Sequence, residues 1–408
     1  MGTEIIELKN GLRVVFQPST LPISHACILI NAGSRDESAS AFGVAHFIEH
    51  LLFKRTVKRS TSQILNHLER VGGDLNAFTT KEYTCIHASF LRPHLSKTVD
   101  LFADIIFHSV FPEKEIEKER GVILDELASY RDTPEEAISD DFEDLIFKGH
   151  ALGHNILGTQ DTITGLNKDK ILAFAGTHYN PENSILAITG QYTVTQIRKL
   201  VERYFGDLEN KGRMIPRTPP LQKPGHDMVH IPQAIHQAHT IIGGRAYPVH
   251  HPKRIGLALL SNFLGGMAMS SRLNMEIREK QGIAYNIEAY YSPYQDTGIF
   301  SIYFGTDPEK SEKALKLVHK ELKKLREVKM GPLILSQAKR RFLGQIALAE
   351  ENRMGAITAM AKSLNDLDYI EELPEIFQKT DQITAAQILD IANEICNPDQ
   401  LNVLTFSP

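Results

Sequence analysis

The chain has 408 residues, of which 42% are hydrophobic and 23% are charged, and its formal net charge is −5. This composition is typical of a globular protein with a sizeable core, and the length predicts two to four domains. The charges are mixed in sign and no apolar run reaches membrane-spanning length, so we expect binding neither to nucleic acid nor to a membrane.

The N-terminal residues "MGTEIIELKN" lack the basic stretch and apolar core of a secretion signal. The three cysteines, Cys27, Cys85 and Cys396, lie far apart and match neither a disulfide framework nor a cysteine zinc site. We therefore expect a cytoplasmic protein.

The first part of the chain mixes strands and helices. "EIIEL" and "RVVFQ" are strand-like and flank a turn at "KNG", and "ACILINAG" predicts a buried strand. A helix follows over 43–53, with Ser38 or Ser40 as the expected N-cap. "SQILNHLERVGG" predicts a second helix that ends at its two glycines.

The strand signals continue with "DLNAFTTKEYTCIHASF", which predicts two strands joined by a turn, and long helices are expected from about residue 96 to 147. Strands and helices do not alternate regularly. The sequence therefore favours the α+β class over a doubly wound parallel sheet.

The segment 206–227 is rich in proline and glycine and has no apolar period. We interpret 211–226 as a linker between domains of residues 1–210 and 227–408. The stretch "DKILAFAGTHYNPENSILAIT" resembles "AQILDIANEICNPDQLNVLTF" near the C-terminus. Two generic helix–turn–strand units could match by coincidence. A second match, of "LNHLERVGGDLNAFT" with "LNMEIREKQGIAYNI", favours two tandem homologous domains, each a mostly antiparallel sheet covered by helices.

The helix over 43–53 is apolar almost all round, yet it contains His46, Glu49 and His50. Residues at i, i+3 and i+4 share one helical face, so these side chains project together. Two imidazoles one turn apart suit a tetrahedral zinc site, and Glu49 could act as general base on a water without being a ligand. The alternative for such a histidine is a hydrogen-bonded place in the core.

A third ligand is expected from the helix over 112–132. Its apolar stripe contains Ile116, Ile123 and Tyr130, and Glu119 and Glu126 fall on the same stripe. We assign Glu126 as third ligand and Glu119 as a supporting acid that orients a ligand or the water. The alternative is a solvated or ion-paired helix face.

These motifs resemble the inverted-motif zinc peptidases, which include pitrilysin, insulysin and the mitochondrial processing peptidases. "GVAHFIEHLLFK" resembles the metal helix of that family and "ERGVILDE" its third-ligand helix, with Glu126 lying 76 residues after His50. The resemblance implies one Zn²⁺ per chain, held by His46, His50 and Glu126. It also implies catalytic roles for Glu49 and Glu119.

The resemblance extends to substrate binding. "GGDLNAFTTKEYT" resembles the strand beside the metal, which implies that Asn76, Ala77 and Phe78 pair with substrate backbone. "SSRLNMEIREKQGIAYNI" resembles the second-domain signature, which implies that Arg278 and Tyr285 anchor the substrate. The second copy has "GLALLSNFLGG" in place of the metal helix and no ligand atoms there.

We therefore expect a zinc endopeptidase that hydrolyses short or unfolded polypeptides inside a dimeric chamber. A homodimer is expected because one chain carries both the metal residues and the Arg/Tyr pair, although a heterodimer stays possible. Two alternatives remain open: a noncatalytic scaffold subunit, and a processing peptidase that removes targeting peptides. His150 and His154, in "GHALGHNILGT", are interpreted as loop residues rather than ligands.

Overall fold

The computed structural model describes residues 2–210, 215–220 and 225–408, so part of the predicted linker, 211–214 and 221–224, lies outside the described residues. Two compact units form. The first contains Met1–Ala128, His154–Arg217 and Ala349–Ile370, and the second contains Ser129–Gly153, Thr218–Leu348 and Glu371–Pro408. The division into homologous domains at 210 and 227 stays a prediction, because compactness measures contacts and not homology.

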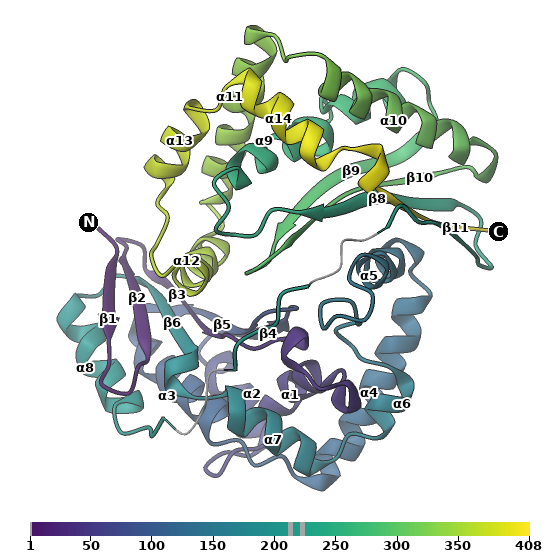
Figure 1. Cartoon of the computed structure of the whole chain (residues 1–408). Coiled ribbons are helices and arrows are strands. Elements are labelled where there is room, and N and C mark those ends of the chain that lie inside the picture. The colour runs from purple at the N-terminus through teal and green to yellow at the C-terminus, as the bar shows by residue number, and fades with distance from the viewer. Residues whose placement is uncertain (1, 211–214, 221–224) are drawn as a thin grey trace. The chain divides into compact units, whose positions relative to one another are not determined.

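The first unit is built on a six-stranded sheet in the order β1-β2-β6-β3-β5-β4 (Figure 1). The β2–β6 pair is parallel and the other pairs are antiparallel. The strands are β1 (Glu4–Glu7), β2 (Arg13–Pro18), β3 (Ile23–Ile30), β4 (Asp74–Thr79), β5 (Thr84–Leu91) and β6 (Ser184–Gly190).

Both faces of this sheet are covered by helices. Along β3, Ala26, Ile28 and Ile30 point into one core, and Cys27 and Leu29 point into another, as the two-residue period of a strand requires. The first core is closed by α1 (Val44–Leu52), α2 (Thr61–Glu69), α3 (Leu95–Phe107), α4 (Glu113–Arg131), α6 (Gln160–Thr164), α7 (Lys168–His178) and α8 (Val194–Phe205).

The second core is closed by α12 (Arg353–Leu367), which comes from the C-terminal half of the chain. Ile357 and Ala361 of α12 are fully buried there, and Arg13 Nη1 of β2 donates to the carbonyl oxygen of Leu364 at 3.2 Å. Figure 1 shows this yellow-green helix beside the purple strands β2 and β3. The first unit therefore borrows a helix from far along the chain.

The second unit contains a five-stranded sheet in the order β7-β11-β8-β10-β9. Its β7–β11 pair is parallel and the others are antiparallel. The strands are β7 (Met228–Pro232), β8 (Ala238–Ala246), β9 (Ala284–Pro293), β10 (Gly298–Thr306) and β11 (Asn402–Ser407).

Helices cover this sheet in the same manner. One face packs on a core that includes α9 (Arg254–Gly265), the π-helical segment η5 (Asn274–Glu279), α10 (Ser311–Glu327), α11 (Pro332–Ala349) and α14 (Ala385–Ile395). Helix α13 (Leu373–Asp381) belongs to the same unit. The opposite face packs on α5 (Pro134–Ile146), which comes from the N-terminal half, through Ile138, Phe142 and Ile146. Each unit thus takes one helix from the other half of the chain.

The two sheets repeat one topology. Strands β2 to β6 and β7 to β11, taken in chain order, occupy equivalent places, and each sheet has its single parallel pair at the equivalent position. The matched segments found in the sequence form α7 and β6 in one unit and α14 and β11 in the other. The predicted α+β class, with two mostly antiparallel sheets, is confirmed.

The lengths and the ends of the helices bear on two of the sequence predictions. No helix in the described ranges is both long and apolar enough to cross a membrane. The predicted N-cap of the helix over 43–53 was wrong, because the helix begins at Val44 and its N-cap is Gly43 rather than Ser38 or Ser40. Residues 38–41 instead form part of a short 3₁₀ turn that precedes the helix.

Candidate functional site

Helix α1 carries three of the predicted site residues on a largely buried segment. Its apolar residues fix it in the core and are at most 1% exposed: Val44, Ala45, Phe47, Ile48, Leu51 and Leu52. His46, Glu49 and His50 share the remaining side of the helix. His46 is buried, and Glu49 and His50 are partly buried.

Helix α4 brings Glu126 to the two histidines. Glu126 Oε1 lies 3.8 Å from His46 Nε2, and Glu126 Oε2 lies 3.6 Å from His50 Nε2. One ligand atom from each of these residues lies within 4.8 Å of the others, and they form the one such group in the described ranges. The structure therefore brings together the three residues that were assigned to the metal.

The geometry and chemistry of this group fit zinc. In a tetrahedral site with ligands ~2.1 Å from the metal, two ligand atoms lie about 3.4 Å apart. This is close to the 3.8 and 3.6 Å that separate the oxygens of Glu126 from His46 and His50. Burial, and to a lesser degree the nearby His50, lowers the pKa of His46 to about 3. His46 therefore stays neutral at pH 7, which is the form of imidazole that binds a metal.

The predicted burial of the two acids on α4 is half right. Glu119 is only 3% exposed, but the side chain of Glu126 is 45% exposed. The buried stripe runs through Ile116, Glu119, Ile123 and Leu127, so Glu126 lies at its edge. Glu126 reaches the histidines from this edge because its side chain is long enough to span the gap.

Glu119 contacts the ring nitrogen of His50 that does not face Glu126. Its Oε2 lies 3.2 Å from His50 Nδ1, and its Oε1 lies 2.7 Å from the Nζ of Lys54. When His50 Nδ1–H donates to this carboxylate, Nε2 is left with a lone pair toward Glu126. Glu119 therefore fixes the tautomer of His50, and Lys54 balances its charge.

Glu49 is held by the neighbouring strand. Thr79 Oγ1, at the end of β4, donates to Glu49 Oε2 at 2.6 Å. Burial raises the pKa of Glu49, and the nearby Glu126 adds to the rise, while the hydrogen bond from Thr79 and the proximity of His50 oppose it. A carboxylate with a raised pKa and a fixed orientation is suited to move a proton.

Strand β4 lies at the edge of its sheet, and within the described residues it pairs with β5 alone. Phe78 is partly buried on the α12 side, where its ring lies 6.0 Å from the rings of Tyr83 and His87. The amide of Ala77 donates to the side-chain Oδ1 of Asn76 at 2.8 Å. A peptide that paired with Ala77 would displace this side chain.

Arg278 and Tyr285 belong to the second compact unit. Arg278 lies on η5, its side chain is 43% exposed, and the ion pair it makes with Glu279 is long at 4.0 Å. Tyr285 lies on β9, is 42% exposed, and its ring lies beside Gly305. Both side chains are thus available to a ligand.

Two residues that contact the predicted site were missed from the sequence. Thr79 follows Leu75 and Ala77 on the face of β4 that packs toward α1, so strand alternation could have placed Thr79 on that face but not beside Glu49. Lys54 follows His50 by four residues and lies in the turn just after α1 ends. Neither pattern is distinctive enough by itself to indicate a role.

The fold and the group of His46, His50 and Glu126 define a two-unit α+β protein with a candidate metal centre in its first unit. Residues 13–160 match the family model described as "Insulinase (Peptidase family M16)", and residues 165–342 match "Peptidase M16 inactive domain".

Two bacterial relatives match almost the whole chain. "Uncharacterized zinc protease YmxG" of Bacillus subtilis (strain 168) is 31% identical over 394 residues, which cover 96% of this chain and 95% of that protein. An "Uncharacterized zinc protease" of Rickettsia bellii (strain RML369-C) is 34% identical, with 96% and 94% covered. A protease from Helicobacter pylori has the same fold, with a TM-score of 0.93 over all of both chains at 24% identity. The chain belongs to peptidase family M16, the insulinase family.

Proposed function

We propose that the protein is a zinc-dependent endopeptidase in which His46, His50 and Glu126 hold one Zn²⁺ and Glu49 is the general base. The observation that carries the proposal is the group of two imidazoles and one carboxylate, with a second carboxylate, the partly buried Glu49, on the same helical turn as the imidazoles. The names of the bacterial relatives, which call them zinc proteases, also support it.

The residues around the group have separate roles in this mechanism. When bound, zinc supplies Lewis acidity, which favours ionisation of water and polarises a carbonyl group. Glu49 accepts the proton of the attacking water and passes it to the leaving amine, while Thr79 holds the carboxylate in place. Glu119 keeps His50 in the tautomer whose Nε2 faces the metal side.

The substrate is an extended peptide that adds to the edge of the first sheet. An edge strand presents backbone N–H and C=O groups that a peptide can pair with, which gives affinity with little dependence on sequence. Asn76, Ala77 and Phe78 of β4 make this contact, and the Asn76 side chain leaves the amide of Ala77 as the peptide enters. Short or unfolded polypeptides meet this requirement.

The active form is a homodimer that encloses a chamber. One chain carries two units with a repeated topology, and α9, the described helix of the second unit that corresponds to α1, contains no His, Cys, Asp or Glu. Exposed Arg278 and Tyr285 of the second unit anchor the substrate of the partner's site. The proposal is supported by the sequence, because one chain carries both the metal residues and the Arg/Tyr pair.

The test is a comparison of the wild-type protein with Glu49→Gln. We expect the wild type to bind one Zn²⁺ per chain and to cleave a library of quenched fluorescent peptides. Glu49→Gln should keep zinc and fold but lose ~10²–10⁴-fold in turnover, the usual contribution of a general base.

Zinc content, circular dichroism and peptide turnover are measured on the same preparations. Wild-type protein without zinc and without turnover would favour the noncatalytic scaffold. Cleavage confined to targeting peptides would favour a processing peptidase. Substantial turnover by Glu49→Gln would exclude Glu49 as the base.

A further inference from the structure

The metal helix begins in the interior of the first unit, where its end needs hydrogen-bond partners. The first amides of any α-helix have no partner within the helix, and leaving them unpaired in the core is costly. Here the N-cap is Gly43, which is buried, has a φ of +92° and offers no side chain to accept a hydrogen bond. The acceptor must come from elsewhere in the chain.

Glu37 supplies it from six residues upstream. Its Oε2 accepts from the amide of Gly43 at 2.7 Å, and its Oε1 accepts from the amide of Ala45 at 2.8 Å. The side chain of Glu37 is fully buried. Because His46 follows Ala45 directly, the carboxylate holds the backbone next to a metal-binding residue.

The loop that contains His154 completes this arrangement. His154 Nε2 lies 3.0 Å from Glu37 Oε2, and its ring stacks on Phe42 with 3.8 Å between ring centroids and 12° between ring planes. Lys81 Nζ donates to the carbonyl oxygen of His154 at 2.6 Å. This histidine is a loop residue, as the sequence predicted, and it contacts the cap of the metal helix.

The backbone of the loop at Leu157 and Gly158 also packs closely against the backbone at the start of α1. A Cβ on Gly43 would lie 2.6 Å from the carbonyl oxygen of Leu157, and a Cβ on Gly158 would lie 2.3 Å from that of Phe42. Both glycines have positive φ values. Little room is left for the helix end to move along its axis.

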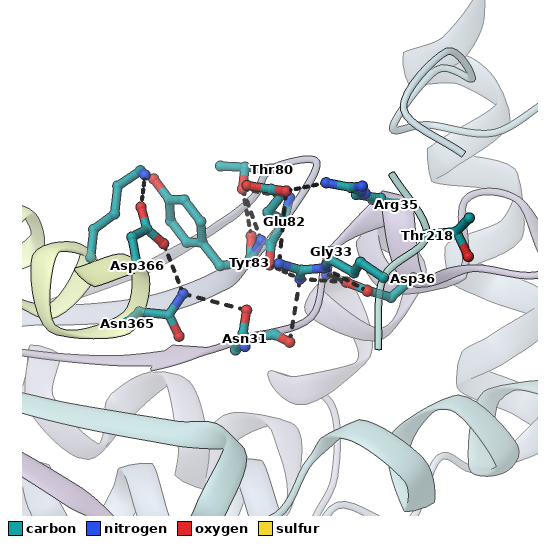
Figure 2. A network of polar contacts seen from close by, with 12 residues as sticks. Asn31, Gly33, Arg35, Asp36, Thr80, Glu82, Tyr83, Thr218, Asn365 and Asp366 are labelled. Atoms are coloured by element: carbon teal, nitrogen blue, oxygen red, sulfur yellow. Dashed lines mark hydrogen bonds and ion pairs between the residues drawn. The ribbon is translucent and has the colours of Figure 1, made fainter. Parts of the chain in front are cut away.

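The segment that delivers Glu37 is itself fixed to the turn after β4. Ser34 and Arg35 donate backbone N–H groups to the carbonyl oxygens of Thr80 and Lys81, at 3.1 and 2.8 Å. Arg35 also pairs with Glu82 at 2.6 Å, as Figure 2 shows. Thr79, which holds Glu49, directly precedes this turn.

We propose that Glu37 is a positioning residue of the metal centre: supported by His154, it fixes the start of α1 relative to the turn after β4. The same framework then sets where His46 lies and how Glu49 meets Thr79. The inference rests on the proposed function, because it assigns Glu37 a role in zinc binding and in turnover.

The test replaces Glu37 without changing its size. Glu37→Gln replaces one acceptor oxygen by an NH₂ group. This group is a donor, so it cannot accept the hydrogen bond from the backbone amide of Gly43 or Ala45. We expect zinc affinity, measured by competition with a chelator, to fall about 10–100-fold, the usual effect of losing a group that orients a ligand. On a quenched peptide kcat should fall while KM stays unchanged, because β4 is intact.

A matched variant separates positioning from general destabilisation. Asp104 of α3 lies in the same unit, and its side chain is as fully buried as that of Glu37. It accepts hydrogen bonds from Thr56 and Arg59, so Asp104→Asn removes a comparable carboxylate. It should lower the melting temperature without changing zinc affinity. His154→Phe keeps the ring stacked on Phe42 but loses the hydrogen bond to Glu37, and should weaken zinc binding less than Glu37→Gln does.

The outcomes distinguish the two proposals. If the wild type binds no zinc, the proposed function is wrong. If the wild type binds zinc and Glu37→Gln binds it equally well, or weakens it no more than Asp104→Asn, the positioning role is wrong. Should Glu37→Gln fail to fold by circular dichroism, His154→Phe provides the decision, and unchanged zinc affinity in that variant overturns the inference.

Discussion

The two carboxylates of α4 that meet the histidines differ in what they contact. Glu126 faces the Nε2 atoms of both His46 and His50, whereas Glu119 faces Nδ1 of His50 and the ammonium group of Lys54. We therefore predict that Glu126→Ala abolishes measurable zinc binding. Glu119→Ala should weaken it by about 10–100-fold, because it releases the orientation of one ligand without removing a ligand.

Chelator competition on both variants measures this difference. Glu113→Ala, which removes an exposed carboxylate from the first turn of the same helix, is the control and should bind zinc as the wild type does. Equal zinc affinity in Glu126→Ala and Glu119→Ala would reverse or remove the assigned roles.

Helical periodicity predicted which side chains of α1 meet at the candidate site. The spacing of His46, Glu49 and His50 placed them on one side of a helix. Glu126 was assigned to the same site because a catalytic zinc centre needs a third ligand, and the family resemblance implied the same residue. The contacts of Thr79 with Glu49 and of Glu37 with Gly43 could not be predicted in this way. They join side chains to partners on other segments, and no period along the chain encodes such a pairing.

Helix α12 covers one face of the first sheet, and we expect its packing to contribute to the stability of the first unit. Ile357 is fully buried against the sheet face formed by residues such as Cys27 and Leu29. Ile357→Ala should therefore lower the free energy of unfolding of the first unit by ~2–5 kcal/mol, since truncation of a buried Ile leaves a cavity. Leu348→Ala truncates a side chain that is 74% exposed and should change stability little.

Hydrogen exchange of the backbone amides measures this loss of stability separately for each strand. In Ile357→Ala the amides of β3 and β6 should exchange faster, while those of β8 and β10 keep their protection. Loss of protection confined to β8 and β10 would show that α12 stabilises the second sheet instead.

Whether a segment forms a helix or a strand was easier to predict than which other element it packs against. Strand alternation and turn residues indicated β2, β3, β4 and β5, and the repeat in the sequence indicated two sheets of one design. The exchange of α5 and α12 between the halves left no such signal. An amphipathic helix shows which of its sides is apolar, but its sequence does not say which sheet that side will meet.

For the whole molecule, the proposed dimer makes a prediction about shared sites. If Arg278 and Tyr285 of one chain serve the zinc group of its partner, two inactive variants should complement each other. Glu49→Gln and the double variant Arg278→Ala with Tyr285→Phe should each be nearly inactive as homodimers. A mixed dimer then contains one site with an intact Glu49 and an intact anchoring pair, and turnover should recover in part.

Subunit exchange is followed by tagging each variant differently and isolating the mixed dimer. Mixing Glu49→Gln with wild-type protein is the control for exchange itself. Isolated mixed dimers that stay inactive would show that the pair acts within its own chain, or has no part in turnover.

The exchange of helices also has a consequence for biosynthesis. The strands of the first sheet are complete when the ribosome has passed Gly190, but α12 is translated only near the end of the chain. Translation proceeds at ~5–20 residues per second, so roughly tens of seconds pass before α12 is available to pack on the face that includes Val15, Leu29 and Ala187. The nascent chain exposes an apolar sheet face during that time, so a chaperone bound there would favour folding over aggregation.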